Sequence, residues 1–188
     1  MTAYPRKSIL LAAIAVLALS GCQTLNKDQC SVTDWRTLGS TDGASGRPQN
    51  YVARHQEACT KFGIPVDIPA WQSGWQEGIR NFCTPANGLD IGMRGSGYDN
   101  SCPADQAIPF REAYDTGYRV YSARSERDRI QGELDTAIAE LAGVKEEDRT
   151  VRQIQIELKR SELFAAQNRL NDAERAVDFY RLRMSTAR

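Results

Sequence analysis

Apolar and aromatic residues follow a helical rhythm in two segments near the middle of the chain. Between Pro69 and Cys83, large side chains recur at steps of four, four and three residues, so they share one face of a predicted helix. These side chains are Trp71, Trp75, Ile79 and Phe82. The same steps recur in Phe110, Tyr114, Tyr118 and Tyr121. The pattern therefore predicts one helix design that is used twice.

Small residues stand beside the aromatic stripe in both segments, at Gly74, Gly78, Ala113 and Gly117. Glycine inside a helix costs about 1 kcal/mol relative to alanine, so its use here needs a compensating contact. A small notch beside large rings lets a second backbone come close. The two stripes are expected either to pack into one small core or to leave an aromatic groove open for a ligand or partner.

A heptad pattern dominates the last third of the chain. Apolar residues recur at steps of three and four, at Leu163, Ala166, Leu170, Ala173, Val177, Tyr180 and Met184. Thr150 and Gln153 have the spacing of a capping box, which predicts a helix start near residue 150. A preceding apolar series lies between Ile130 and Val144. The pattern predicts an antiparallel helical hairpin, or a coiled coil that recruits another chain.

Glycine-rich stretches separate the predicted helices. Asp-Gly followed by another glycine indicates a turn over residues 40–46, and a helix is expected over residues 48–62. Residues 87–102 contain four glycines and are expected to form an irregular loop or a short hairpin. If a recognition surface exists outside the helices, this loop supplies it through Arg94, Tyr98, Asp99 and Asn100.

These patterns predict a mainly α fold, in which a small helical domain with glycine-rich loops precedes a long helical hairpin or coiled coil. The expected organisation is a signal peptide over residues 1–21, a stapled globular domain over 22–108 and an arm over 109–188. About 167 residues remain after the signal peptide, enough for one domain and an extended element.

The N-terminal segment has the composition of a secretory signal. Arg6 and Lys7 precede an apolar run over residues 9–19, and small residues follow. That run is about half of the roughly 20 residues that cross a bilayer, so a spanning helix is the weaker interpretation. The sequence Leu19-Ser20-Gly21-Cys22 resembles the lipobox of bacterial lipoproteins. The resemblance implies that Cys22 carries diacylglycerol and further acyl chains such as palmitate, and Gln23 after it implies the periplasmic face of the outer membrane.

Lipidation of Cys22 would leave an even set of cysteines. Cys30, Cys59, Cys83 and Cys102 are then expected to form two disulfides in an oxidising periplasm. Three pairings are possible. We favour Cys30 with Cys59 and Cys83 with Cys102, because each bridge closes a loop of modest length. A metal site built from these sulfurs and His55 is disfavoured, because there is one histidine and no Cys-x-x-Cys spacing.

Composition excludes several functional classes. Lys+Arg and Asp+Glu balance at 24 each, and no basic run marks a nucleic-acid surface. The common hydrolase motifs Gly-x-Ser-x-Gly and His-Glu-x-x-His do not occur, so we expect no catalytic residues and no cofactor. A cell-wall hydrolase that uses paired carboxylates remains the weakest alternative. His55 recurs with Tyr51 and Cys59 on one helix face and is expected in the interior.

Several of these residues together carry a family resemblance over about residues 22–122. They are Trp35 to Gly39, Asp42, Gly43, Gly46, Cys59, Gly63, Trp75, Gly78, Phe82, Cys83, Gly88, Gly92, Gly95, Tyr98 and Cys102. The chain resembles the YfiL-like family of uncharacterised proteobacterial lipoproteins, which contains the domain of unknown function 2799. That family has no established activity, so the resemblance implies an address and a fold.

The sequence therefore favours a non-enzymatic outer-membrane lipoprotein. It would act as an envelope scaffold that engages a protein partner, or another copy of itself, through the coiled-coil arm. The alternative is a lipoprotein that binds peptidoglycan or another glycan with the glycine-rich loop.

Overall fold

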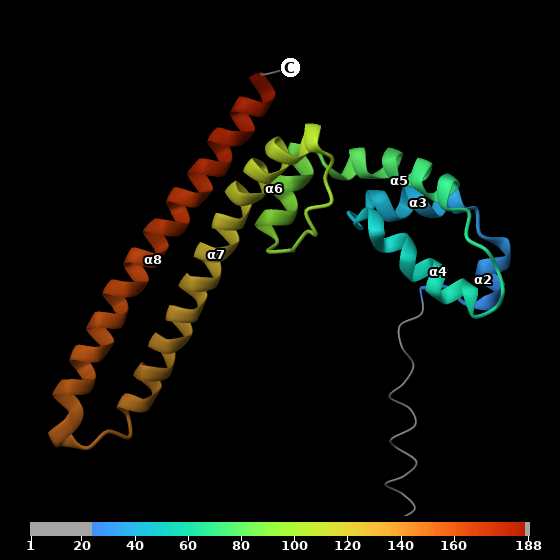
Figure 1. Ribbon diagram of the computed structural model, residues 1–188. Coiled ribbons are helices and arrows are strands. Elements are labelled where there is room, and N and C mark those ends of the chain that lie inside the picture. Colours follow the sequence, from blue (N-terminus) through green and yellow to red (C-terminus); the bar gives the residue numbers. More distant parts are fainter. Residues whose placement is uncertain (1–23, 187–188) are drawn as a thin grey trace, which may run out of the picture.

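The computed structural model describes residues 24–186, and this part of the chain consists of α-helices and connections with no β-strand (Figure 1). The expected signal peptide and the lipidation site Cys22 lie outside the described residues. The predicted fold class is confirmed, because a disulfide-stapled helical region precedes a long helical hairpin. None of the helices between residues 24 and 186 is both long and apolar enough to cross a membrane.

Residues 24–82 form the N-terminal part of the structure. Its elements are α2 (Lys27–Val32), α3 (Trp35–Ala44), the short 3-10 helix η2 (Gln49–Tyr51), α4 (Val52–Thr60) and α5 (Ile68–Phe82). Side chains cap three of the helices. Asn26 forms a capping box at α2, and Asp34 and Asp67 accept hydrogen bonds from N–H groups at the starts of α3 and α5. These bonds lower the pKa of Asp34, chiefly through the backbone N–H of Thr37.

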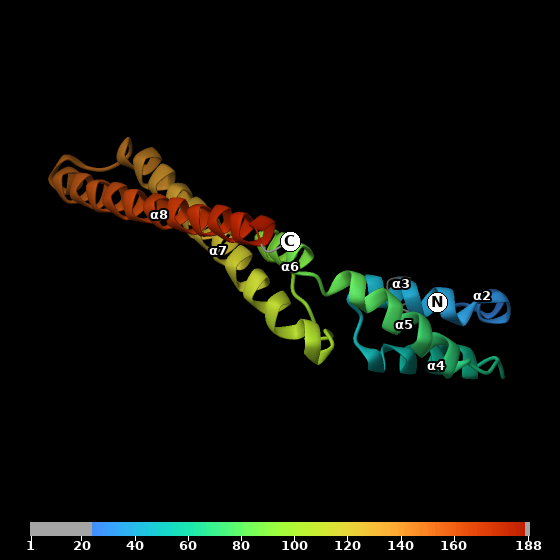
Figure 2. The ribbon, with the colours of Figure 1, turned by 90° about the horizontal axis from the view of Figure 1, so that it is seen from above.

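Residues 85–186 form α6 (Pro85–Met93), α7 (Ala104–Leu141) and α8 (Glu146–Thr186). α7 has 38 residues and α8 has 41, so each is about 60 Å long at 1.5 Å per residue. The two helices run antiparallel, and Lys159 of α8 lies 2.8 Å from Glu133 of α7. The hairpin turn and α2 lie at opposite ends of the molecule in both views (Figures 1 and 2).

The heptad residues of α8 face the inside of this hairpin. Leu170 and Val177 pack in one cluster with Leu89 of α6 and Val120 of α7. The other heptad residues are buried or half-buried: Leu163, Ala166, Ala173, Tyr180 and Met184. Of the two expected arrangements, the antiparallel hairpin is the one present, so this seam is covered within the chain.

The start of α8 differs from the prediction. The helix begins at Glu146, so Thr150 lies inside it and is no cap. Glu146, Glu147 and Asp148 occupy the first turn, where negative charge favours the positive end of the helix dipole. The expected boundary between residues 108 and 109 falls inside the continuous helix α7, and Phe110 is fully buried in the core.

Two stretches expected to be irregular are helical. Residues 40–44 belong to α3 and residues 87–93 belong to α6, so the predicted turn and much of the predicted loop are wrong. The irregular part is limited to residues 94–103. Glycines in both helices misled the prediction, because they serve contacts between helices.

α3 pairs with α5, and α6 pairs with α7, at backbone-to-backbone range. A Cβ atom on Gly74 would collide with the carbonyl oxygen of Arg36, and one on Gly78 would collide with that of Ser40. The glycines with such contacts are Gly39, Gly43, Gly74 and Gly78 in the first pair and Gly88, Gly92 and Gly117 in the second. Both sets of contacts advance in the same direction along the two partners, so the helices of each pair are parallel.

The two pairs are copies of one structural unit. Three glycines at steps of four and three residues recur in each, two in the first helix and one just after its end: Gly39, Gly43 and Gly46, then Gly88, Gly92 and Gly95. Gly46 and Gly95 have φ angles of 75° and 70°, and the rings of Phe82 and Tyr121 lie against them. The aromatic repeat of α5 and α7 is thus one half of a larger repeat, whose other half is α3 and α6.

Both favoured disulfides are present. Cα–Cα distances are 5.7 Å for Cys30–Cys59 and 5.5 Å for Cys83–Cys102. Each bridge joins the segment before the first helix of a pair to the segment before the second helix. Because the paired helices are parallel, both starts lie at the same end, where one disulfide can connect them.

Candidate functional site

Most of the aromatic stripe of α5 lies in the core. Trp71 and Ile79 are fully buried, and Phe110 of α7 joins them in one cluster. The stripe of α7 is less covered, with Tyr118 and Tyr121 about 40% exposed on the surface.

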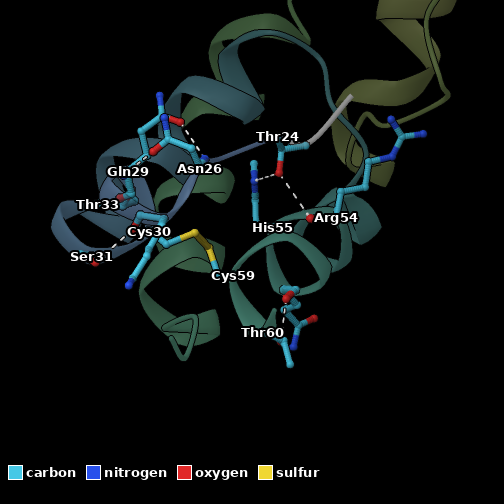
Figure 3. The surroundings of a disulfide bond; sticks show 12 residues. Thr24, Asn26, Gln29, Cys30, Ser31, Thr33, Arg54, His55, Cys59 and Thr60 are labelled. Carbon is cyan, nitrogen blue, oxygen red and sulfur yellow. Dashed lines mark hydrogen bonds between the residues drawn. A yellow bond between two sulfur atoms is a disulfide. The ribbon is translucent and has the colours of Figure 1, made fainter. Parts of the chain in front are cut away.

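A buried polar network links three separate segments around His55, and Figure 3 shows the part of it that involves Thr24 and Arg54. Nε2 of His55 lies 2.8 Å from Oδ2 of Asp42, and the indole N–H of Trp71 donates to the same oxygen at 2.9 Å. On the other edge of the ring, Nδ1 of His55 lies 2.9 Å from the hydroxyl of Thr24. That hydroxyl also donates to the carbonyl oxygen of Arg54 at 3.3 Å.

This network suits a structural role. The His55 side chain is 3% exposed, and the rings of Trp35, Tyr51 and Trp71 surround it at centroid distances of 5.3 to 6.4 Å. Both ring nitrogens already have partners, so no free nitrogen faces a substrate. Sequence reasoning placed His55 in the interior but missed Asp42, because the Asp-Gly pair read as a turn.

An open groove of about 700 Å³ lies where the two units meet. Trp75 and Ile79 are among the residues that line it. The indole N–H of Trp75 already donates a hydrogen bond to the carbonyl oxygen of Arg47 at 2.8 Å. Polar side chains dominate the rim: Gln49, Asn50, Gln76, Arg80, Asp99 and Asn100. Asn100 has a φ of 50°, in the left-handed region. Carboxamides offer donors and acceptors together, which suits a neutral polar ligand.

Three of the four loop residues that sequence grouped together line one hollow smaller than the groove: Arg94, Tyr98 and Asp99. Asp99 and Asn100 line the groove. Tyr98 packs its ring against Phe110 at 5.0 Å and therefore belongs to the core. Arg94 pairs with Asp90 at 3.1 Å, and the smaller hollow that it lines has a volume of about 380 Å³. The amides from η2 and α5 carry no motif, so the sequence held no signal for them.

The outer face of α8 carries an apolar stripe near the hairpin turn. Val151, Ile154 and Leu158, which we call the outer stripe, are 57 to 60% exposed. At 100° per residue they lie opposite Ile156, which is 4% exposed and faces α7. The outer stripe therefore remains open after the hairpin has formed.

Acidic and sulfur-containing side chains give no metal centre in the described range. Between residues 24 and 186, no three His, Cys, Asp or Glu side chains are grouped closely enough to hold a metal ion.

One family model matches part of the chain. Residues 34–119 match the model of a family described as a protein of unknown function, DUF2799. The matched range contains both helix pairs up to the middle of α7. No curated protein and no solved structure matches the chain.

Proposed function

We propose that this chain, whose residues 34–119 form a DUF2799 region, is a non-enzymatic outer-membrane lipoprotein that engages a protein partner through its hairpin arm. The partner is either another envelope protein or a second copy of the chain. The outer stripe is the observation that carries this proposal, because three large aliphatic side chains face solvent on one helix face.

The spacing of the outer stripe suits a helical partner. Residues 151, 154 and 158 follow the i, i+3, i+7 pattern by which one helix lies against another. The heptad seam supplies no such face, because α6 and α7 already cover it. The arm places the outer stripe at the end of the molecule opposite to α2 (Figure 1), where a partner could reach it while the N-terminal end is held at a membrane.

Crosslinking in intact envelopes tests the partner. The double variant Ile154→Asp/Leu158→Asp should lose the crosslinks that the unaltered chain forms near residue 154. The control Gln153→Asp/Gln155→Asp adds the same charge beside the stripe and should keep them. An unchanged crosslink pattern in the stripe variant contradicts the proposal, and light scattering of the purified protein distinguishes self-association from a second protein.

Membrane anchorage has its own test. Metabolic labelling with palmitate should mark the unaltered protein. The labelled protein should be recovered in the outer-membrane fraction. The Cys22→Ala variant should be unlabelled and leave that fraction. A Cys22→Ala protein that stays in the membrane would remove the lipoprotein part of the proposal.

A second candidate function is binding of peptidoglycan or another glycan in the groove between the units. The carboxamide-rich rim favours it, since amides can bond both hydroxyls and acetamido groups. Asn100→Gly, combined with Gln76→Ala, removes two amides and allows the left-handed backbone at residue 100. This variant should sediment less with purified sacculi than the unaltered chain, and equal sedimentation would exclude the groove as the binding site.

A further inference from the structure

The residues just after the expected lipid site belong to the folded N-terminal unit. The Thr24 hydroxyl lies between Nδ1 of His55 and the carbonyl oxygen of Arg54, at 2.9 and 3.3 Å. The next residue, Leu25, is 8% exposed and packs with the disulfide Cys30–Cys59. Within the described residues, the chain is thus already packed at the second residue after Cys22.

Chain geometry limits how far the unit can stand from an anchor. Two residues span at most about 7 Å, so the Cα atom of Thr24 lies within about 7 Å of that of Cys22 in any conformation. A diacylglycerol group on Cys22 would be seated in the bilayer. The surface around Thr24 would then lie at the level of the lipid headgroups.

A cationic and aromatic patch occupies this surface. Tyr51 packs edge-on against His55 at a centroid distance of 5.3 Å, and the guanidinium groups of two arginines lie over its ring. The Cζ atoms of Arg47 and Arg54 lie 4.4 and 5.3 Å from the ring centroid. Both arginines are exposed. Figure 3 shows the Arg54 side chain leaving α4 beside Thr24. We call Arg47, Tyr51 and Arg54 the headgroup patch.

We propose that the headgroup patch lies on the membrane surface and binds the phosphate groups of anionic phospholipids. The inference rests on lipidation of Cys22, which belongs to the proposed function. Guanidinium groups form paired hydrogen bonds with phosphate oxygens, and a tyrosine ring suits the boundary between headgroups and acyl chains. The lipid anchor makes these weak contacts effective, because it holds the patch at a high local concentration of lipid.

The contact fixes the orientation of the protein. A single acylated residue leaves the attached unit able to rotate about its tether. Two arginines beside the anchor add further points of attachment, each of which favours an anionic surface by about fivefold in binding constant. The headgroup patch is thus a membrane-facing surface, distinct from the outer stripe that faces a protein partner.

Energy transfer in vesicles tests the orientation. The full lipidated chain is reconstituted into phosphatidylethanolamine vesicles with and without phosphatidylglycerol, and a dye is attached to Ala53→Cys on α4. Transfer to an acceptor on the lipid headgroups should be high in anionic vesicles and should fall at high salt. The variant Arg47→Glu/Arg54→Glu should lose this salt-sensitive transfer.

A matched control and a flotation assay separate the two proposals. Arg111→Glu/Arg119→Glu makes the same change of charge on α7 and should transfer energy as the unaltered chain does. If the protein floats with vesicles but Arg47→Glu/Arg54→Glu transfers as before, the headgroup patch is overturned and the lipid anchor stands. If the unaltered protein does not float, both proposals fail. Far-ultraviolet circular dichroism confirms that each variant is folded.

Discussion

Asp42 is the residue at which the first unit is most sensitive to a single change. Its carboxylate is buried and accepts hydrogen bonds from His55 and Trp71, which come from α4 and α5. Three helices therefore meet at one oxygen atom. When a buried polar group loses its hydrogen-bond partner, the free-energy cost of its desolvation remains and the bond that compensated for it is gone.

Replacing Asp42 should destabilise the protein markedly. Asp42→Ala leaves the His55 and Trp71 N–H groups without an acceptor, which should lower the free energy of unfolding by about 1–3 kcal/mol. Urea unfolding of the oxidised protein, followed by tryptophan fluorescence, measures the change. Asp90→Ala, which removes an exposed carboxylate paired with Arg94, should change stability by less than about 0.5 kcal/mol. Equal effects of the two substitutions would contradict the role of Asp42.

At the scale of the helix, glycines occupy two kinds of position. Gly78 of α5 faces the backbone of α3, whereas Gly132 of α7 has no atom within 4 Å of the place where a Cβ would stand. Replacing glycine with alanine should therefore lower the free energy of unfolding at residue 78 and raise it at residue 132. Gly78→Ala forces α3 and α5 apart and should cost about 1–3 kcal/mol.

The control for Gly78→Ala lies in the same protein. Gly132→Ala should stabilise the hairpin by up to about 1 kcal/mol, because alanine has the higher helix propensity. Thermal unfolding followed by circular dichroism compares the two variants. A stabilising Gly78→Ala would show that the backbones of α3 and α5 are not in contact.

The helical hairpin should also depend on pH through Glu133. Hydrogen bonds from Lys159 and Arg129 lower the pKa of this carboxyl below its ordinary value of 4.5. Its contribution to stability is therefore complete above that value and is lost as the pH falls through the lower, folded-state pKa. Glu133→Gln should be less stable at neutral pH and should lose less stability on acidification.

Hydrogen exchange along α7 and α8 between pH 7 and pH 3 measures this dependence. Glu157→Gln serves as the control, because Glu157 pairs with Arg160 within α8 and does not bridge the hairpin. If acid opens the hairpin equally in the unaltered chain and in Glu133→Gln, the ion pairs between the helices do not contribute.

The sequence predicted some helices better than others for a physical reason. α5 and α7 carry large side chains on one face, so their helical periodicity remains visible although each contains two glycines. α3 and α6 are short and owe their packing to glycine, which by itself favours turns. Their helical state depends on a partner backbone that is remote in sequence, and no local pattern reports it. The disulfide pairing was predictable because each bridge joins two cysteines that follow one another in sequence, 29 and 19 residues apart.

The residues of the candidate sites were likewise predictable only where a local sequence pattern marked them. Periodicity placed His55 in the interior. Its partners Asp42 and Thr24 come from other segments, so only the folded structure joins them. The groove draws on η2, α5 and the loop over residues 94–103, and its residues share no spacing.

At the scale of the whole molecule, the arm and the second unit depend on each other. α8 covers Leu89 of α6 and Val120 of α7, which are 4% and 1% exposed. Removing residues 123–188 would uncover both side chains, at a cost of about 2 kcal/mol each. Deletion of the arm is thus a test of folding as well as of partner binding.

Hydrogen exchange of a chain that ends at residue 122 should show this dependence. Amides of α6 and of the remaining part of α7 should exchange faster than in the full chain, whereas α3 and α5 should keep their protection. Equal protection of α6 in both chains would mean that the second unit is stable without α8.

The position of the disulfides decides which parts of the chain carry a mechanical load. Tension applied between residue 24 and the arm passes from Cys30 directly to Cys59, runs along α5, and crosses from Cys83 to Cys102 into α7. The residues enclosed by the two bridges, which include α3 and α6, lie outside this covalent path. A pull on the arm would therefore strain α5 and α7 first, while the enclosed helices could detach without lengthening the chain.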